Sequence, residues 1–199
     1  VYIDFSKAFD SIVHSKLLFK LGLYGIDGPL LKWIDIFLAN RMQCVVTDYC
    51  FSPFCNVISG VPQGSVLGPI LFLIYVNDLS TVCCGNTVLQ LFADDAKLYS
   101  NISINDGTLV SLQQSLCNLS HWAKEWQLSI NVSKCLVISI STNPKPAHVV
   151  YYIDDSPIPR QNSTIDLGVT VTDDLSFELH INTIVSKARQ RISVLFRGF

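Results

Sequence analysis

Two acidic side chains stand next to each other inside an apolar segment, LFADDAKLY at residues 91–99. Residues that favour β-strands flank Asp94 and Asp95 on both sides, so we expect the pair at the tip of a hairpin. Two unit negative charges about 4 Å apart repel by roughly 4 kcal/mol at an effective dielectric constant near 20. The pair therefore needs either solvent at an exposed turn or a bound cation nearby.

Two other Asp-Asp pairs allow a comparison within the same chain. One, at 154–155, precedes a Ser-Pro sequence, and the other, at 173–174, precedes an expected helix. Aspartates in such places commonly form turns or cap helices. The pair at 94–95 differs because a short hairpin turn more often uses Asn-Gly or Asp-Gly. Both interpretations, a solvated turn and a metal site, stay open from this feature alone.

A third carboxylate, Asp4, lies within the strand-like segment VYIDF at residues 1–5. A lone charge in a central strand is costly unless it is paired or bound to a cation. If this strand lies beside the hairpin, Asp4 comes close to Asp94. Oxygen ligands supplied partly by protein and partly by substrate phosphate are those that Mg²⁺ prefers. Two such ions roughly 3.5 to 4 Å apart would support phosphoryl or nucleotidyl transfer.

The elements that would position these acids follow from hydrophobic periodicity. It predicts amphipathic helices over 14–24, 29–40 and 109–126, an apolar helix from the loop GVPQGSVLGP to about 77–78, and a last helix with apolar positions from 181 to 195. Strands are expected at 1–5, 88–92, 96–100 and 136–140, with one hairpin formed by 43–51 and 56–58 and another by 149–153 and 165–171. The sequence NPKP at 143–146 resembles a boundary. This order of elements favours an α+β fold, a split βαβ sheet with helices packed on one face.

Composition limits the class of protein. The chain has 199 residues, of which 49% are hydrophobic and 15% charged, which excludes a disordered segment because the apolar surface is ample. The longest apolar run, 69–76, is far shorter than the roughly 20 residues of a membrane helix. The net charge of −2 argues against nucleic-acid binding, but a basic stretch without acids, including Lys187, Arg189 and Arg191, weakens that objection. The seven cysteines are odd in number and form no C-x-x-C pair, so we expect reduced thiols.

Three segments in this order resemble motifs A, B and C of reverse transcriptases, in the form found in non-LTR (LINE, jockey-like) retrotransposons: YIDFSKAFDSIVHSKLL, SGVPQGSVLGPILFLIYVNDL and LFADDAKLY. HWAKEWQLSINVSKC resembles motif D, and IDLGVTVTDDLSFELHI resembles the segment that leads through motif E into the thumb. The resemblance covers essentially the whole chain. It implies a ferredoxin-like polymerase palm over 1–142 with a fingers-side excursion at about 25–60, a motif E hairpin region over 143–175, and the start of a thumb helix over 176–199.

The resemblance also implies residue roles. The metal-binding and catalytic acids would be Asp4, Asp94 and Asp95, and Lys134 would protonate the pyrophosphate leaving group. Phe9 would be the steric gate that excludes a ribose 2′-hydroxyl, and Pro62, Gln63 and Gly64 would contact the incoming nucleotide and the template. The basic residues Lys187, Arg189 and Arg191 would face the nucleic-acid backbone. The plainer alternatives are a core phenylalanine, a loop that leads into a helix, and surface lysines and arginines.

The implied function is RNA-directed DNA synthesis by two-metal nucleotidyl transfer, with two Mg²⁺ ions and Mn²⁺ as the alternative. The implied partners are an RNA template, a DNA primer and dNTPs, with no membrane, and with fingers, thumb and an endonuclease as further domains of the same polyprotein. The expected location is the nucleus during reverse transcription and otherwise the cytoplasm. Because the chain begins at motif A, we expect it to polymerise poorly or not at all by itself.

Two alternative functions remain at this stage. One is a catalytically silent or domesticated RNA-binding remnant of the same fold. The other is an RNA-dependent RNA polymerase, which usually carries Gly-Asp-Asp and a smaller gate residue, so Ala93 and Phe9 count against it.

Overall fold

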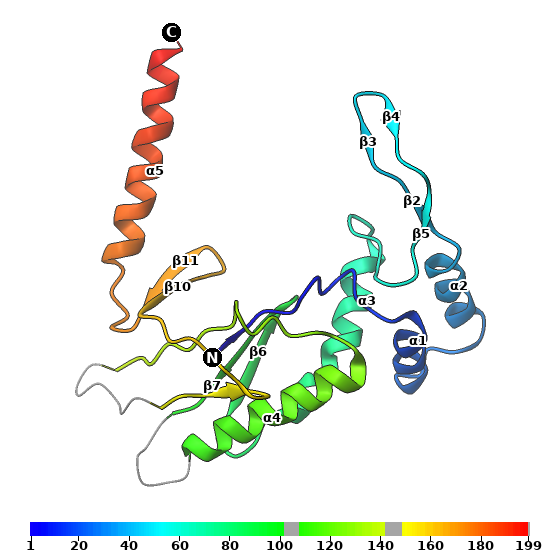
Figure 1. Ribbon diagram of the computed structural model, residues 1–199, viewed down its shortest axis with the longest axis horizontal. Coiled ribbons are helices and arrows are strands. Elements are labelled where there is room, and N and C mark those ends of the chain that lie inside the picture. The colour runs from blue at the N-terminus through cyan, green and yellow to red at the C-terminus, as the bar shows by residue number, and fades with distance from the viewer. Residues whose placement is uncertain (102–107, 142–148, 199) are drawn as a thin grey trace.

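The computed structural model describes residues 1–101, 108–141 and 149–198 (Figure 1). Helices and short, mostly antiparallel strand pairs alternate along the chain, so the fold is α+β. The helices are α1 (His14–Leu23), α2 (Gly28–Leu38), α3 (Leu67–Val76), the 3₁₀ helix η1 (Asn77–Val82), α4 (Thr108–Trp126) and α5 (Glu178–Arg197). They confirm the predicted helices, with ends that differ by a few residues.

The central sheet has three antiparallel strands in the order β1-β7-β6. These are β1 (Tyr2–Ile3), β6 (Val88–Phe92) and β7 (Asp95–Tyr99). Tyr2 pairs with Lys97 and Ile3 with Ala96, whereas β6 and β7 form a hairpin that Phe92 and Asp95 close. The first strand therefore lies beside the hairpin, as the sequence predicts.

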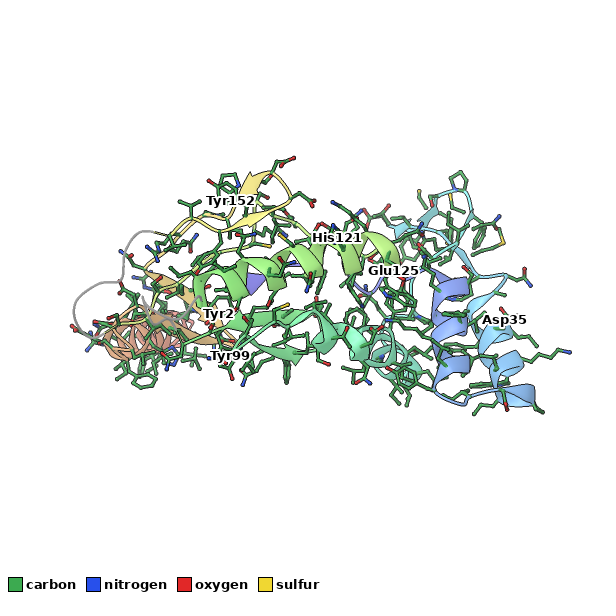
Figure 2. All side chains as sticks on the ribbon, turned by 90° about the horizontal axis from the view of Figure 1, so that it is seen from below. Tyr2, Asp35, Tyr99, His121, Glu125 and Tyr152 are labelled. Atoms are coloured by element: carbon green, nitrogen blue, oxygen red, sulfur yellow. The ribbon has the colours of Figure 1, made fainter. Side chains whose placement is uncertain are left out.

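One hydrophobic core joins this sheet to the helices α1, α2, α3, η1 and α4. Ile3 and Leu98 from the sheet are buried in it. Apolar side chains of the helices complete it, including Leu17 and Leu21 of α1, Leu71 and Phe72 of α3, and Leu116 and Leu119 of α4. The opposite side of α4 is polar, and His121 and Glu125 lie exposed on it (Figure 2). This core fixes the sheet relative to the loop that precedes α3.

The segment after α2 is a ribbon that projects from the helices (Figure 1). Its strands β2 (Met42–Gln43) and β5 (Cys55–Asn56) pair at the base, and β3 (Val46–Thr47) and β4 (Cys50–Phe51) pair near the tip. We call residues 42–56 the ribbon arm. The prediction of one continuous strand over 43–51 is wrong, because Asp48 and Tyr49 have φ values of 44° and 67° and form the turn within it.

The predicted pairing of 149–153 with 165–171 is also wrong. Instead β8 (Tyr152–Ile153) pairs with β9 (Ser156–Pro157), and β10 (Ser163–Asp166) pairs with β11 (Val169–Thr172). A tight turn closes each hairpin locally, and a short loop costs less closure entropy than a long one. The strand predicted at 136–140 is reduced to single bridges from Leu136 to Tyr2 and from Val137 to Arg160. The boundary predicted at 143–146 lies outside the described residues.

The two Asp-Asp pairs used for comparison lie in turns, as expected. Asp154 stands in the β8–β9 turn and forms an ion pair with Lys124 of α4. Before α5, Asp174 accepts a hydrogen bond from the Ser176 amide, and the Ser176 hydroxyl accepts one from the Glu178 amide. The second pair thus supports the turn, and the Ser176 hydroxyl binds the first amide of α5.

Across the described ranges, no helix combines the length and the apolar character needed to cross a membrane.

Candidate active site

Two of the three predicted acids open onto one pocket. Continuing the β1–β7 register by one residue sets Asp4 opposite Asp95, and Asp94 occupies the two-residue turn between β6 and β7. Asp4 and Asp94 both line a pocket of about 760 Å³, which is within the usual size of a small-molecule site. Residues far apart in the sequence thus share one wall.

Asp95 faces a different space. It lines a smaller pocket of about 170 Å³, together with Asp4 and Lys134. Within the described residues, no three His, Cys, Asp or Glu side chains lie close enough to hold a metal ion by themselves. Asp4 is therefore the acid common to both pockets, and the three acids do not gather into a single ligand group.

The acids are nevertheless coupled electrostatically. Although Asp95 as a residue is exposed, partial desolvation of its carboxyl raises its pKa, and the charges of Asp94, Asp166 and Asp4 add to this effect. Lys97 acts in the opposite direction. The like charges that add to the effect of desolvation mark a region of concentrated negative potential, which attracts cations.

The backbone of Asp4 is held from both sides by one turn. The Asn131 amide donates to the Asp4 carbonyl at 2.8 Å, and the Asp4 amide donates to Cys135 Sγ at 3.5 Å. Burial raises the pKa of the Cys135 thiol, which stays protonated and donates to the Asn131 carbonyl at 3.3 Å. Lys134 belongs to the same turn and lines both pockets. Asp4 and Lys134 are therefore positioned by the same backbone contacts.

The loop before α3 also contributes to the larger pocket. Pro62, Gln63 and Gly64 all line it. Gln63 Nε2 donates to Asp10 Oδ1 at 2.8 Å, and the Val61 amide donates to the Phe9 carbonyl at 2.8 Å. These bonds attach the loop to the segment that follows Asp4.

Gly60 permits this close approach. Its φ is 83°, and a Cβ there would lie 2.7 Å from the Asp10 Cα, closer than real Cβ atoms come to backbone. Only glycine combines this left-handed conformation with such proximity.

Phe9 both packs against the core and lines the larger pocket. Its ring stacks on Phe72 of α3, with centroids 4.4 Å apart and planes 19° apart, and it packs against the core. The residue is only partly buried and also lines the larger pocket. The stack therefore fixes a ring in the pocket that Asp4 and Asp94 also line.

The three basic residues of α5 are not brought to either pocket. Lys187, Arg189 and Arg191 are exposed, and α5 packs against β11 while projecting away from the central sheet (Figure 1).

Comparison with known proteins identifies this arrangement. Residues 1–171 match the model of the family described as reverse transcriptase (RNA-dependent DNA polymerase). The chain belongs to the reverse transcriptase family.

Three curated relatives of this reverse transcriptase chain come from flies of the genus Drosophila. It is 29% identical to the probable RNA-directed DNA polymerase from transposon X-element of Drosophila melanogaster, over 97% of this chain and 21% of that protein. It is 29% identical to the RNA-directed DNA polymerase from mobile element jockey of Drosophila funebris, over 96% of this chain and 21% of that protein. It is 30% identical to the probable RNA-directed DNA polymerase from transposon BS of Drosophila melanogaster, over 98% of this chain and 22% of that protein. The chain thus spans about a fifth of the length of these relatives.

The structure adds residues to this reverse transcriptase site that the sequence analysis did not assign. Asn131 lines the larger pocket, while Lys97 and Asp166 line the smaller one. Lys97 could have been found by alternation, because it lies two residues after Asp95 and shares its face of the strand. Asp166 gave no such signal, since only the tertiary structure brings it to the sheet.

Proposed function

We propose that this chain provides the catalytic carboxylates of an RNA-directed DNA polymerase of the non-LTR retrotransposon kind. The observation that carries the proposal is the shared pocket of Asp4 and Asp94, with Phe9, Gln63 and Lys134 around it. The names of the fly relatives, RNA-directed DNA polymerases from mobile elements, support the same activity. The reaction is the addition of a deoxynucleotide to a primer 3′-hydroxyl on an RNA template.

In the finer architecture that we propose, residues 1–142 form a polymerase palm of the split βαβ type, with a fingers-side excursion at about 25–60. Residues 143–175 form the motif E hairpin region, and 176–199 begin the thumb helix. The order β1-β7-β6 and the projecting ribbon arm support this division.

Two Mg²⁺ ions, with Mn²⁺ as the alternative, are the proposed cofactors. Asp4 and Asp94 would hold them, with Asp95 assisting from the smaller pocket. The donor set fits, because Mg²⁺ commonly takes one or two carboxylates and completes its shell with water and substrate phosphates. Bound there, the ions would activate the attacking oxygen and neutralise the charge of the leaving group.

Phe9 and the loop at 62–64 recognise the incoming nucleotide. Held against Phe72, the Phe9 ring occupies the space of a ribose 2′-hydroxyl, so a deoxyribose fits and a ribose clashes. Gln63, tied to Asp10, lies against the base or the template, and Gly64 allows close backbone approach there.

Lys134 supplies the proton for the leaving group. Lys134 lines both pockets together with Asp4, and the turn at 131–135 holds its backbone. Proton donation from a positioned group to pyrophosphate is general-acid catalysis.

The partners in this proposal are an RNA template, a DNA primer and dNTPs. Lys187, Arg189 and Arg191 contact the nucleic-acid backbone, and further domains of a longer polyprotein complete the polymerase. The proposed location is the nucleus during reverse transcription and the cytoplasm otherwise.

The first test is Mg²⁺-dependent binding of a dNTP to the 199-residue chain, measured by calorimetry. We expect Asp4→Asn and Asp94→Asn to weaken binding by roughly tenfold or more, because charge-assisted contacts are the strongest polar contacts. Asp155→Asn, in the β8–β9 turn, is the matched control and should bind as the wild type does.

Equal binding by all four proteins would contradict the proposal. RNA binding without any Mg²⁺-dependent dNTP binding by the wild type would favour the silent RNA-binding remnant instead.

A further inference from the structure

We propose that Asp166 is a positioning residue that fixes the β10–β11 hairpin to the sheet carrying the acids, through Tyr2 and Lys97. The attachment of the hairpin is argued from contacts alone. Its effect on cation binding rests on the proposed function.

The contacts come from two neighbouring strands. Tyr2 of β1 and Lys97 of β7 are opposite each other in the register, so their side chains lie on the same face of the sheet. The Tyr2 hydroxyl donates to Asp166 Oδ2 at 3.3 Å, and Lys97 Nζ forms an ion pair with Asp166 Oδ1. Lys97 Nζ also lies 5.8 Å from the centroid of the Tyr2 ring. Each oxygen of one carboxylate is thus bound from a different strand.

This polar cluster is well placed to dominate the attachment. Lys97 and Asp166 are each only 19% exposed, so solvent screens their interaction much less than that of a surface pair. The apolar side chains of the hairpin contribute little, since Ile165 is 71% exposed and Leu167 is 54% exposed. Figure 2 shows Tyr2 at the end of the sheet that lies close to the β10–β11 hairpin.

The position of the hairpin determines one wall of the smaller pocket. Residues 164–167 line it together with Asp4, Asp95 and Lys134. Asp4 and Lys134 belong to the larger pocket as well. A hairpin that moves away from the sheet therefore opens the space next to the acids.

Asp166 also controls where the Lys97 charge lies. Lys97 stands two residues after Asp95 on the same face of β7. While Asp166 binds the ammonium, Asp95 remains available to a cation. Without Asp166 the ammonium is free to pair with Asp95 and to compete with a divalent ion.

The test of the attachment is hydrogen exchange of the amides at 163–172 in the 199-residue chain. In Asp166→Asn, Lys97→Met and Tyr2→Phe we expect exchange to be faster, by roughly tenfold in Asp166→Asn, because local opening becomes easier. The double variant Lys97→Asp with Asp166→Lys swaps the two charges and should recover most of the protection from hydrogen exchange. Loss of packing alone would not allow this recovery.

Asp154→Asn is the matched control. It removes the ion pair between Lys124 and Asp154 at the β8–β9 hairpin, whose side chains are 62% and 48% exposed. This variant should leave amide exchange at 163–172 unchanged. Exchange of α4 amides at the wild-type rate confirms that each variant remains folded. If the hairpin amides of Asp166→Asn exchange at the wild-type rate, the proposal is overturned, whatever the polymerase assays give.

The effect on cation binding is measured separately, by titration with Mn²⁺ followed by its paramagnetic resonance signal. We expect Asp166→Asn to weaken Mn²⁺ binding by roughly threefold or more, because one negative charge is lost and one ammonium is released. Wild-type affinity in this variant overturns the proposed control of Lys97. Absence of Mn²⁺ binding by the wild type overturns the proposed function instead, while the exchange result still decides the attachment.

Discussion

Ala93 adopts a backbone conformation that its side chain disfavours. Its φ is 52°, at the first central position of the two-residue turn between β6 and β7, where hairpins prefer glycine or asparagine. A left-handed conformation costs a non-glycine residue roughly 1–2 kcal/mol. The sheet register around it, from Phe92 to Asp95, forces this turn. The packing of the sheet therefore compensates for the backbone strain next to the acidic pair.

Gly60→Ala should destabilise the protein more than Gly25→Ala does. Both glycines have positive φ values, 83° and 80°, but a Cβ at Gly60 meets the Asp10 backbone whereas nothing lies within 4 Å of one at Gly25. We expect a loss of about 1 kcal/mol in Gly25→Ala from conformation alone, and about 3 kcal/mol or more in Gly60→Ala. Urea unfolding measures both values. Equal losses of unfolding free energy would show that the loop moves away from the added Cβ without an energetic penalty.

Phe9→Ala should reduce discrimination between deoxyribonucleotides and ribonucleotides. Removal of the ring opens the space beside Phe72, so we expect the ratio of dNTP to rNTP affinity to fall by roughly tenfold. Mg²⁺-dependent binding of matched nucleotides measures it. Phe51→Ala, at a side chain 70% exposed on β4, is the control. An unchanged ratio in Phe9→Ala would leave Phe9 only its role in packing.

At the scale of elements, a buried lysine joins α1 to α3, η1 and α4. Lys20 is 2% exposed, and its Nζ donates to the Tyr75 carbonyl and to Asp78 Oδ1 at 2.5 Å. The rings of Trp126 and Trp122 surround the same ammonium, with centroids 3.7 and 4.9 Å away. Trp122 Nε1 also donates to Asp78 Oδ1 at 3.2 Å. This cluster fixes the helices that support the pocket loop.

Lys20→Met should destabilise the fold by about 2–3 kcal/mol, because Asp78 and the Tyr75 carbonyl lose their buried partner. Lys16→Met, one turn earlier on α1, is the matched control. Its Nζ donates to the Glu125 carbonyl from a more accessible position, so we expect a loss below about 1 kcal/mol. Thermal unfolding of both variants measures the difference, and similar values would contradict a special role for Lys20.

The shifted pKa of Lys20 predicts that the stability of the fold depends on pH. Desolvation lowers the Lys20 pKa from its ordinary value of 10.5, against the opposing effect of Asp78. The unfolded chain therefore binds more protons between the lowered pKa and 10.5, so the Lys20 contribution to stability increases with pH across that window. Subtracting the curve of Lys20→Met from that of the wild type isolates this contribution. A difference that declines with pH would contradict it.

At the scale of the whole molecule, the chain is more extended than its mass requires. Its accessible surface is 13038 Å², whereas a compact monomer of 22.2 kDa exposes about 9,400 Å². The ribbon arm and α5 both project from the body of the fold (Figure 1). No side chain of α5 is buried, and apolar residues such as Ile184 and Leu195 are exposed on it. Two elements thus offer surface for contacts beyond the core.

Replacement of Lys187, Arg189 and Arg191 by glutamine should weaken RNA binding and reduce its dependence on salt. Each phosphate contact contributes about 0.7 to the slope of log affinity against log salt for a single strand, so we expect the slope to decrease by about 2. Fluorescence anisotropy with a labelled RNA at several salt concentrations measures it. An unchanged slope would remove α5 from the proposed nucleic-acid interface.

Sequence alone determined the family and the placement of the acids at the end of the first strand and in the hairpin. The apolar residues around Asp94 and Asp95 predict a hairpin, and the periodicity of α1 and α4 predicts helices, because these signals are local. The order of helices and strands then predicts that the first strand lies beside the hairpin, which the register confirms.

Only the tertiary structure decided how the acids divide between two pockets and how the C-terminal hairpins pair. Asp95 faces away from the pocket shared by Asp4 and Asp94, and Asp166 reaches Tyr2 and Lys97. Neither follows from sequence spacing, because each depends on strand register and on contacts between residues far apart in the chain. Local patterns specify elements, whereas the packing between elements specifies which side chains meet.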